Sequence, residues 1–336
     1  MERREFLAGL AAIGASALVP DVRTEAQTRP ATTPLRIDVH YHGNSPGFIA
    51  AIKAHNTGQA ALMNWTPTKA LEDMDRDGVA TVIMSTREPS VYFGDAAAAR
   101  ALARECNEYF ARLVSDHPTR FGMFATLPLP DVDGALREIE YAFGTLKADG
   151  ACFMSSYEGK YLGDPAFAPV MDELNRRKAV CYTHPFRGGM INMLPEGRAL
   201  GVTLSTETTL TIQSILYTNT AMRCPDIRFI WSHGGGTAPY ITSRLGAAVG
   251  PDGKPNANLA ALQKFYYDTA QAFNPYTLAT LTRVVPMSHI LFGTDYPFAQ
   301  AATVAKGLAD FGFKPADLRA IERDNALELL PRLKRN

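Results

Sequence analysis

The sequence predicts a single (β/α)8 TIM barrel, a fold of the α/β class. Its 336 residues are 46% hydrophobic and 20% charged, which is typical of a globular protein with a large core. Eight short apolar runs follow Pro34, nearly continuous rather than alternating, as in parallel strands buried on both faces. Amphipathic stretches separate these runs with no clear linker among them, so strand and helix alternate throughout.

The predicted strands are rich in β-branched or aromatic residues. They are residues 35–40, 79–85, 121–126, 150–154, 179–183, 227–232, 265–269 and 290–294. A doubly wound sheet is the alternative fold. No GxGxxG motif follows the first strand, however, so the barrel is favoured.

Four of the intervening stretches carry helix start signals. An Asp or Thr, in two cases followed by Pro, precedes each amphipathic segment, as expected of an N-cap. The first predicted helix follows Thr66-Pro67 and ends at Asp77-Gly78. The other three span residues 96–116 after Asp95, 132–147 after Asp131 and 166–177 after Asp164-Pro165.

The N-terminus reads as an export signal. Its uncharged run, Phe6 to Val19, has 14 residues, whereas a membrane span needs about 20. Arg3-Arg4-Glu5-Phe6-Leu7 resembles the twin-arginine consensus. We therefore expect a signal peptide at 1–26, with cleavage after Ala17 or Ala26 left open, a linker at 27–34 and one domain at 35–336. A cytosolic amphipathic start is the alternative to this periplasmic address.

Charge and cysteine content exclude several classes. The 34 Lys and Arg residues balance 34 Asp and Glu residues, which gives no reason to expect nucleic acid or an anionic membrane as partner. The four cysteines show no CxxC spacing, which excludes a disulfide scaffold or a cysteine zinc site. The apolar run is too short for a stable membrane anchor.

Polar side chains gather at the predicted strand ends, where such barrels carry their active sites. His40 and His42 close the first strand, His184 the fifth and His233 the sixth, while Asp295 follows the eighth. A His-x-His pair on an extended strand points both rings to one side, so both can bind one ion. A further histidine and an aspartate complete a nitrogen and oxygen set that suits zinc.

Asp268 closes the seventh predicted strand. A carboxylate there can orient a metal-binding histidine from behind. The remaining histidines, His55, His117 and His289, lie in helical or loop contexts, and we interpret them as structural or solvated.

The motifs IDVHYH, THP, SHGGG and LFGTDYP resemble the amidohydrolase superfamily. The chain is similar to its aminocarboxymuconate-semialdehyde decarboxylase-related branch. The stretches LPLPDVDGALREIEYAFGTLKADG and YLGDPAFAPVMDELNRRKAV resemble the 6-methylsalicylate decarboxylase-like subgroup. The resemblance covers nearly the whole chain after Pro34.

This resemblance implies roles for the strand-end residues. It implies that His40, His42, His184 and Asp295 bind one divalent ion, usually zinc, although manganese also suits the set. It assigns acid/base work to His233, and either His233 or Asp295 would deliver the proton. Binuclear relatives carry a bridging Lys or Glu after strand four, where this chain has Ser155-Ser156, so one ion is expected.

The candidates for substrate binding rest on fewer sequence observations than the metal-binding residues do. Arg244 stands eleven residues after His233, the spacing at which the semialdehyde decarboxylase lends an arginine to its neighbour's site, which implies a homodimer. Arg187 could bind a substrate anion, and Trp65 and Phe186 could line an aryl pocket. A second arginine of that enzyme has no match before Trp65, which argues against its substrate.

The resemblance therefore implies a metal-dependent, non-oxidative decarboxylase, a carboxy-lyase. Its substrate would be a small aromatic, 2-hydroxybenzoate-like, or unsaturated carboxylic acid. The alternative is a metal-dependent hydrolase of an ester, lactone or amide, since the same ion and histidine could activate water. A barrel that only binds a ligand is a third reading. A complete ring of metal-binding residues with an acid/base histidine argues against it.

Overall fold

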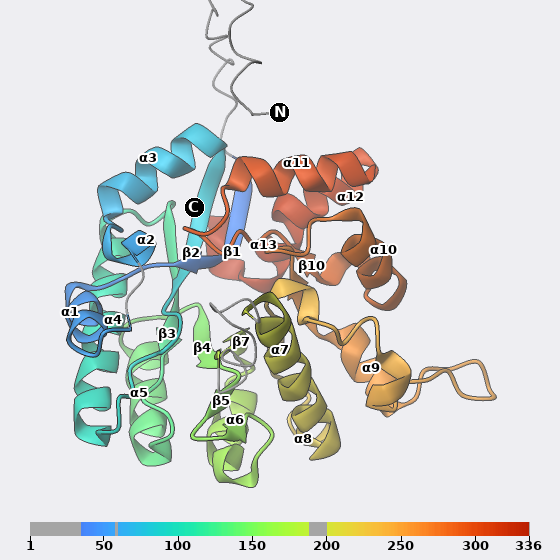
Figure 1. Cartoon of the computed structure of the whole chain (residues 1–336), viewed down its shortest axis with the longest axis horizontal. Coiled ribbons are helices and arrows are strands. Elements are labelled where there is room, and N and C mark those ends of the chain that lie inside the picture. The colour runs from blue at the N-terminus through green and yellow to red at the C-terminus, as the bar shows by residue number, and fades with distance from the viewer. Residues whose placement is uncertain (1–34, 58–59, 188–199, 336) are drawn as a thin grey trace, which may run out of the picture. The chain divides into compact units, whose positions relative to one another are not determined.

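Eight parallel strands form the centre of the molecule, and helices surround them (Figure 1). The computed structural model describes residues 35–57, 60–187 and 200–335. The strands neighbour one another in chain order: β1 (Arg36–His42), β2 (Val79–Ser85), β3 (Phe121–Thr126), β4 (Gly150–Met154), β7 (Val180–His184), β8 (Arg228–Trp231), β9 (Tyr266–Asp268) and β10 (Ile290–Leu291). This arrangement confirms the predicted barrel. The predicted signal peptide and linker, residues 1–34, lie outside the described residues.

The barrel closes where the chain after β10 meets β1. Tyr41 and Tyr296 form a parallel bridge, and the Asp295 N–H donates to the His40 carbonyl at 2.9 Å. Asp38 joins the same two segments. Its carboxylate accepts the Thr294 hydroxyl at 2.6 Å and the N–H groups of Thr294 and His40 at 3.1 and 3.0 Å. The first and last strands are therefore held together directly beneath the polar strand ends.

The observed strands match the predicted runs closely except for the last one. β10 has two residues, Ile290–Leu291, where the pattern predicts 290–294. A Cβ at Gly293 would lie only 2.9 Å from the Cβ atoms of Asp268 and His40, so glycine permits this close approach. Asp295 adopts a left-handed φ of 63°. The chain thus leaves strand geometry early and turns the Asp295 side chain toward β1.

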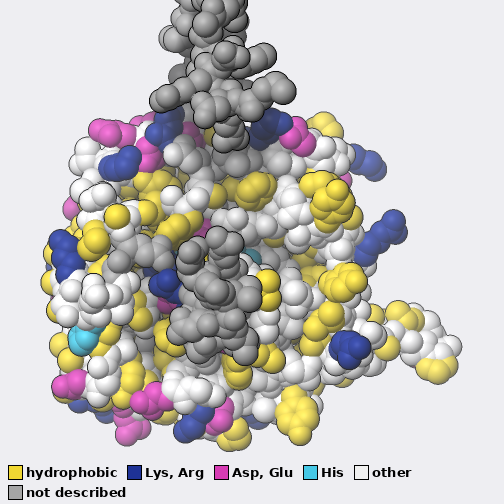
Figure 2. All heavy atoms as spheres, in the orientation of Figure 1, with side chains coloured by type: hydrophobic (Ala, Val, Ile, Leu, Met, Phe, Trp, Pro, Cys, Tyr) yellow, Lys and Arg dark blue, Asp and Glu magenta, His cyan; other side chains and the backbone are white. Residues whose placement is uncertain are grey.

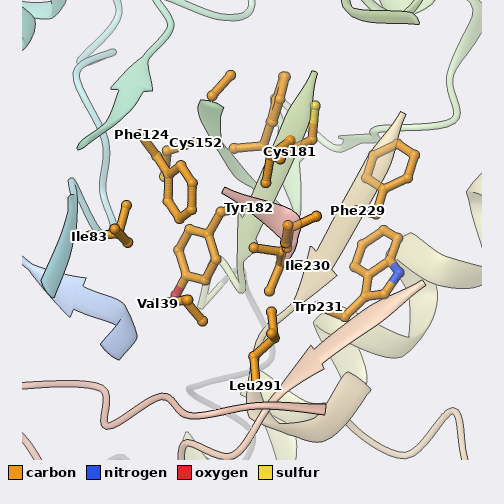
Figure 3. Packing of buried hydrophobic residues seen from close by; sticks show 14 of the residues in the cluster. Val39, Ile83, Phe124, Cys152, Cys181, Tyr182, Phe229, Ile230, Trp231 and Leu291 are labelled. Atoms are coloured by element: carbon orange, nitrogen blue, oxygen red, sulfur yellow. The ribbon is translucent and has the colours of Figure 1, made fainter. Parts of the chain in front are cut away.

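Large apolar side chains fill the barrel (Figure 3). Tyr182 stacks on Phe124 with ring centroids 5.6 Å apart, and its other side contacts the His40 ring edge-on at 5.2 Å. The core therefore supports the first histidine from below. All four cysteines are buried and free, so none of them forms a disulfide.

The helices connect successive strands. They are α1 (Pro46–Ala54), α2 (Ala60–Met63), α3 (Pro67–Asp77), α4 (Ala96–Asp116), α5 (Val132–Gly144), α6 (Ala168–Arg176), α7 (Leu200–Tyr217), α8 (Thr220–Arg223), α9 (Ala257–Lys264), α10 (Pro275–Val284), α11 (Ala301–Phe311), α12 (Pro315–Arg319) and α13 (Asn325–Leu329). Side chains of Thr66, Asp95 and Asp131 cap α3, α4 and α5 as predicted.

Two helices differ from the prediction. The segment 166–177 is divided into a short 3-10 turn, Pro165–Phe167, and α6. Asp164 caps the turn rather than the α-helix, because its side chain accepts the Ala166 N–H at 2.8 Å. α5 ends at Gly144 rather than 147, since Lys147 has a left-handed φ of 58° and cannot continue a helix.

The surface of the described chain agrees with its neutral composition. Basic and acidic side chains are intermixed on the face shown in Figure 2. No helix among the described residues combines the length and apolar character required to span a bilayer.

Asn107 of α4 forms hydrogen bonds to the end of β3, and we expect Asn107→Ala to destabilise the protein. The buried amide accepts the Thr126 N–H at 2.8 Å and donates to the Thr126 carbonyl at 2.9 Å and to Glu138 at 2.8 Å. Removing it leaves buried polar groups unpaired, so the free energy of unfolding in urea should fall by about 2–4 kcal/mol. The exposed Asn64→Ala should change it by less than about 0.5 kcal/mol. Equal effects would contradict this role.

Candidate functional site

Three histidines and one aspartate meet at the carboxyl end of the barrel. His40 and His42 come from β1, His184 ends β7, and Asp295 follows β10. One potential ligand atom from each residue lies within 4.8 Å of the others. Nε2 of His42 and of His40 lie 3.0 and 3.3 Å from Asp295 Oδ1. These four residues, called the metal-binding group below, are the set that the sequence predicts.

Hydrogen bonds made by Nδ1 orient two of the histidine rings. His40 Nδ1–H donates to Asp268 Oδ2 at 2.8 Å, and His184 Nδ1–H donates to the Pro185 carbonyl at 2.9 Å. In the neutral form of each ring, Nε2 is thereby unprotonated and turned toward the group. Among the described residues, His40 Nε2 is buried without a hydrogen-bond partner, as expected of an atom that binds an ion. The donor set fits one divalent metal.

The charges within the group suit metal binding. Burial lowers the pKa of His42 to about 4 and that of His184 well below its usual value. Burial also acts to lower the pKa of His40, but Asp268 and Asp295 outweigh it and raise this pKa to about 10. Burial acts to raise the pKa of Asp295, yet the surrounding rings, His40 foremost, hold it well below the usual range. An entering cation would thus find two neutral imidazoles, His42 and His184, and an ionised carboxylate, and would displace a proton from His40.

His233 lies on the cavity side of Asp295. Its Nε2 is 3.3 Å from Asp295 Oδ2, and its backbone N–H donates to Asp268 Oδ1 at 2.9 Å. Its φ of 55° is left-handed and opens a run of positive φ angles through Gly236. Asp268 therefore positions both His233, through the backbone, and His40, through the ring.

The glycines after His233 serve packing as well as conformation. A Cβ on Gly235 would lie 2.6 Å from the Tyr267 ring, and one on Gly236 would lie 2.2 Å from the Ser205 carbonyl of α7. Gly236 also lines the cavity described next, but the tight contacts with β9 and α7 are what require glycine here.

A cavity of about 440 Å³ opens above the metal-binding group. His184, His233 and Asp295 form its polar floor, and α7 supplies part of its wall. Its lining residues are Arg87, His184, Leu200, Gly201, Leu204, Ser205, His233, Gly236, Gln271, Thr277, Asp295 and Phe298. A volume of this size suits a small aromatic ligand.

The predicted substrate-binding residues lie outside that lining in the described chain. Arg244 is exposed on the short turn Thr242–Leu245. Arg187 pairs with the buried Glu88. Trp65 is 4% exposed within the main core, and Phe186 packs partly buried against the same core.

The lining residues that sequence reasoning missed include Arg87 and Phe298. Arg87 is the second residue after β2, and Phe298 is the third after Asp295. Both follow strand ends, so the rule that found the histidines would also have indicated Arg87. No histidine follows strand two, and for that reason the end of this strand was not predicted to contribute to the site.

A (β/α)8 barrel with this metal-binding group at the carboxyl ends of its strands is typical of metal-dependent hydrolases and lyases. The chain belongs to the amidohydrolase family, whose model matches residues 37–332. It is 36% identical to the decarboxylase yanB of Aspergillus niger, over 88% of each chain. It is also 36% identical to the 6-methylsalicylic acid decarboxylase acuB of Aspergillus aculeatus, over 90% of this chain and 97% of that one.

More distant relatives agree with this family. A 2-amino-3-carboxymuconate-6-semialdehyde decarboxylase of Dictyostelium discoideum is 26% identical over 79% of this chain and 77% of its own. A solved amidohydrolase structure matches with a TM-score of 0.79 and 25% identity, over 88% of this chain and 99% of that chain. The predicted family, its decarboxylase branch and the barrel fold are thereby confirmed.

Replacing Asp268 with Asn should weaken Zn²⁺ binding about 10- to 100-fold without unfolding the protein. The asparagine oxygen can still accept the N–H groups of His233 and Ala270 that Asp268 Oδ1 accepts. Its amide NH2 group would face His40 Nδ1–H, so two hydrogen-bond donors would meet. This favours the His40 tautomer that carries its proton on Nε2. Competition with a chromogenic chelator measures the affinity.

The control for this variant is Asp149→Asn, which changes a buried carboxylate before β4, at the opposite end of the barrel. Asp149 binds Arg332 and the Met123 N–H, so its replacement should leave metal affinity unchanged. Equal affinities in the two variants would show that Asp268 does not orient a metal-binding ring.

Proposed function

We propose that this protein is a metal-dependent, non-oxidative decarboxylase of small 2-hydroxybenzoate-like acids. The observation that carries the proposal is that Asp295 links the metal-binding group to His233 at the floor of one cavity. The 36% identity to an enzyme named 6-methylsalicylic acid decarboxylase supports the reaction and the aromatic substrate.

The metal-binding group would hold the ion through His40, His42, His184 and Asp295. When bound, a divalent ion supplies positive charge that neutralises a carboxylate and an adjacent phenol oxygen. We infer zinc as the resident metal because three imidazoles and one carboxylate suit it, with manganese as the second choice. No glutamate joins the group among the described residues, and the chain has Ser155-Ser156 after β4, which supports a single ion.

His233 is the better of the two predicted proton donors. His233 lines the cavity, and its Nε2 lies 3.3 Å from the carboxylate of Asp295. Asp295 is held ionised by its neighbours, as its depressed pKa indicates, so it has no proton to give at neutral pH. We assign Asp295 to metal binding and to positioning of the His233 ring.

The reaction needs one proton and no oxidant. His233 would protonate the ring carbon that carries the carboxylate, which interrupts the aromatic system at that carbon. The bond to the carboxyl carbon then breaks, its electron pair returns to the ring, and CO2 leaves. His233 is left neutral and regains its proton from solvent, so the balance is one carboxylate anion and one proton giving one phenol and one CO2.

The cavity walls suit a substituted benzene ring. Leu200, Leu204 and Phe298 present apolar surface above the polar floor. The acid group would therefore face the metal-binding group while the ring rests against apolar side chains.

We also propose that the protein works as a homodimer. Arg244 is exposed, away from the cavity lining of its own chain. This placement suits a residue that reaches the site of a second copy.

Zinc-loaded protein incubated with 6-methylsalicylate and related 2-hydroxybenzoates should release CO2, and His233→Ala should lower kcat at least about 100-fold. In D2O, NMR should find deuterium in the product at the carbon that lost the carboxylate, because the proton comes from an exchangeable group. His289→Ala changes a histidine that precedes β10 and stacks on Tyr266, the first residue of β9, away from the carboxyl ends of the strands, and it should leave kcat unchanged.

Hydrolysis is the outcome that would contradict this assignment. Cleavage of aryl esters or lactones that needs His40 and His233, with no CO2 from any acid, would keep the metal-binding group and replace the reaction.

Periplasmic location is a separate proposal, supported by Arg3-Arg4-Glu5-Phe6-Leu7. Replacing both arginines with lysine should retain the protein in the cytoplasm, as judged by immunoblots of cell fractions. Arg23→Lys, outside the motif, should not. The N-terminal mass of the exported form would distinguish cleavage after Ala17 from cleavage after Ala26. Export of the double variant would contradict the twin-arginine route.

A further inference from the structure

Two arginines and one glutamate form a buried cluster beside the cavity. Arg87 Nη2 donates to Glu88 Oε1 at 2.6 Å. Arg187 binds the same carboxylate through its Nε and through its backbone N–H, which donates to Glu88 Oε2 at 2.9 Å. We call these three residues the arginine–glutamate cluster. It joins the segment after β2 to the segment after β7.

The cluster pairs one carboxylate with two guanidinium groups. The Arg87 side chain is 6% exposed and that of Glu88 2%, whereas that of Arg187 is 29% exposed. Arg87 is therefore the buried cation of the cluster, and Arg187 binds the same carboxylate from nearer the surface.

Arg87 is the member of the cluster that faces the cavity. It lines the same space as His184, His233 and Asp295, whereas Arg187 is not among the lining residues of the described chain. Its guanidinium carbon lies 4.6 Å from the centre of the Phe298 ring, which also lines the cavity. Glu88 and Phe298 thus hold the guanidinium from two sides, so little side-chain entropy is lost when it binds a ligand.

The position of Arg87 indicates which part of the substrate it would meet. A cation bound by the metal-binding group and the guanidinium of Arg87 would both face one cavity of about 440 Å³. Two positive centres around a small space favour a ligand whose anionic group lies between them. In a 2-hydroxybenzoate that group is the carboxylate, and a guanidinium matches its planar, two-oxygen geometry.

We propose that Arg87 binds the carboxylate of the substrate and makes the enzyme selective for acids over the phenols they become. This assignment rests on the proposed decarboxylation. Glu88 and Phe298 are positioning residues that hold the Arg87 fork. Because the contact is made to the group that leaves as CO2, the phenol product lacks it and dissociates more readily. Arg87 takes the role that the sequence analysis gave to Arg187.

Binding to an inactive enzyme separates this proposal from the chemistry. In a zinc-loaded His233→Ala background, calorimetry would give the dissociation constants of 6-methylsalicylate and of its product, 3-methylphenol. Adding Arg87→Gln should weaken binding of the acid about 10- to 100-fold, the usual effect of losing a charge-assisted hydrogen bond. It should change binding of the phenol less than about threefold. Arg87→Lys keeps the charge and the Glu88 pair but not the fork, so an intermediate loss is expected.

Arg187→Gln is the matched control, because it removes a positive charge from the same cluster outside the cavity lining. It should weaken acid binding less than Arg87→Gln does. With His233 intact, Arg87→Gln should raise KM for the acid more than it lowers kcat, whereas damage to the fold would lower metal content as well.

Several results would overturn the assignment. Equal loss of acid and phenol binding in Arg87→Gln would show a structural role, and a larger effect of Arg187→Gln would move the role to that residue. Unchanged acid binding in both Arg87 variants would remove Arg87 from the substrate site while leaving decarboxylation intact. If no 2-hydroxybenzoate bound to His233→Ala or released CO2 with the wild type, the proposed function would fall and this inference with it.

Discussion

The seam between the first and last strands is the constraint on which the site depends. Asp38 holds it closed, because one buried carboxylate accepts hydrogen bonds from both His40 and Thr294. Asp295 follows Thr294 directly and donates its own N–H to the His40 carbonyl. A shift of one segment along the other would therefore separate the aspartate from the histidines. The distances within the metal-binding group are consequences of this backbone register rather than of flexible side chains adjusting to one another.

A second carboxylate gives the site its internal order. Asp268 uses one oxygen on the His40 ring and the other on the His233 backbone. His40 and His233 are thus located by the same buried group, at the end of a three-residue strand. The core supports the arrangement from beneath, where Tyr182 lies between Phe124 and the His40 ring. Chemistry at the strand ends and packing inside the barrel are therefore continuous.

Much of this could be predicted from the sequence, and the exceptions have physical causes. Apolar runs located the strands, and polar residues at their ends located the metal-binding group, because both patterns follow from a parallel sheet buried on two faces. Arg187 and Arg87 could not be separated in this way. Each follows a strand and each binds Glu88, and only the path of the backbone decides that Arg87 also lines the cavity. Trp65 lies in the main core, since an aromatic side chain near a strand end can join the core as well as line a pocket.

The close contact between Gly236 and α7 has a consequence for how this enzyme can change. The Ser205 carbonyl lies where a side chain on Gly236 would be, so the helix backbone is fixed against the turn that carries His233. Leu200, Leu204 and Ser205 then project from a fixed frame into the cavity. Substitutions on that one helical face can reshape the space around the ring while the histidines keep their places. Divergence toward new aromatic acids can therefore proceed by single side-chain steps, with the catalytic apparatus inherited unchanged.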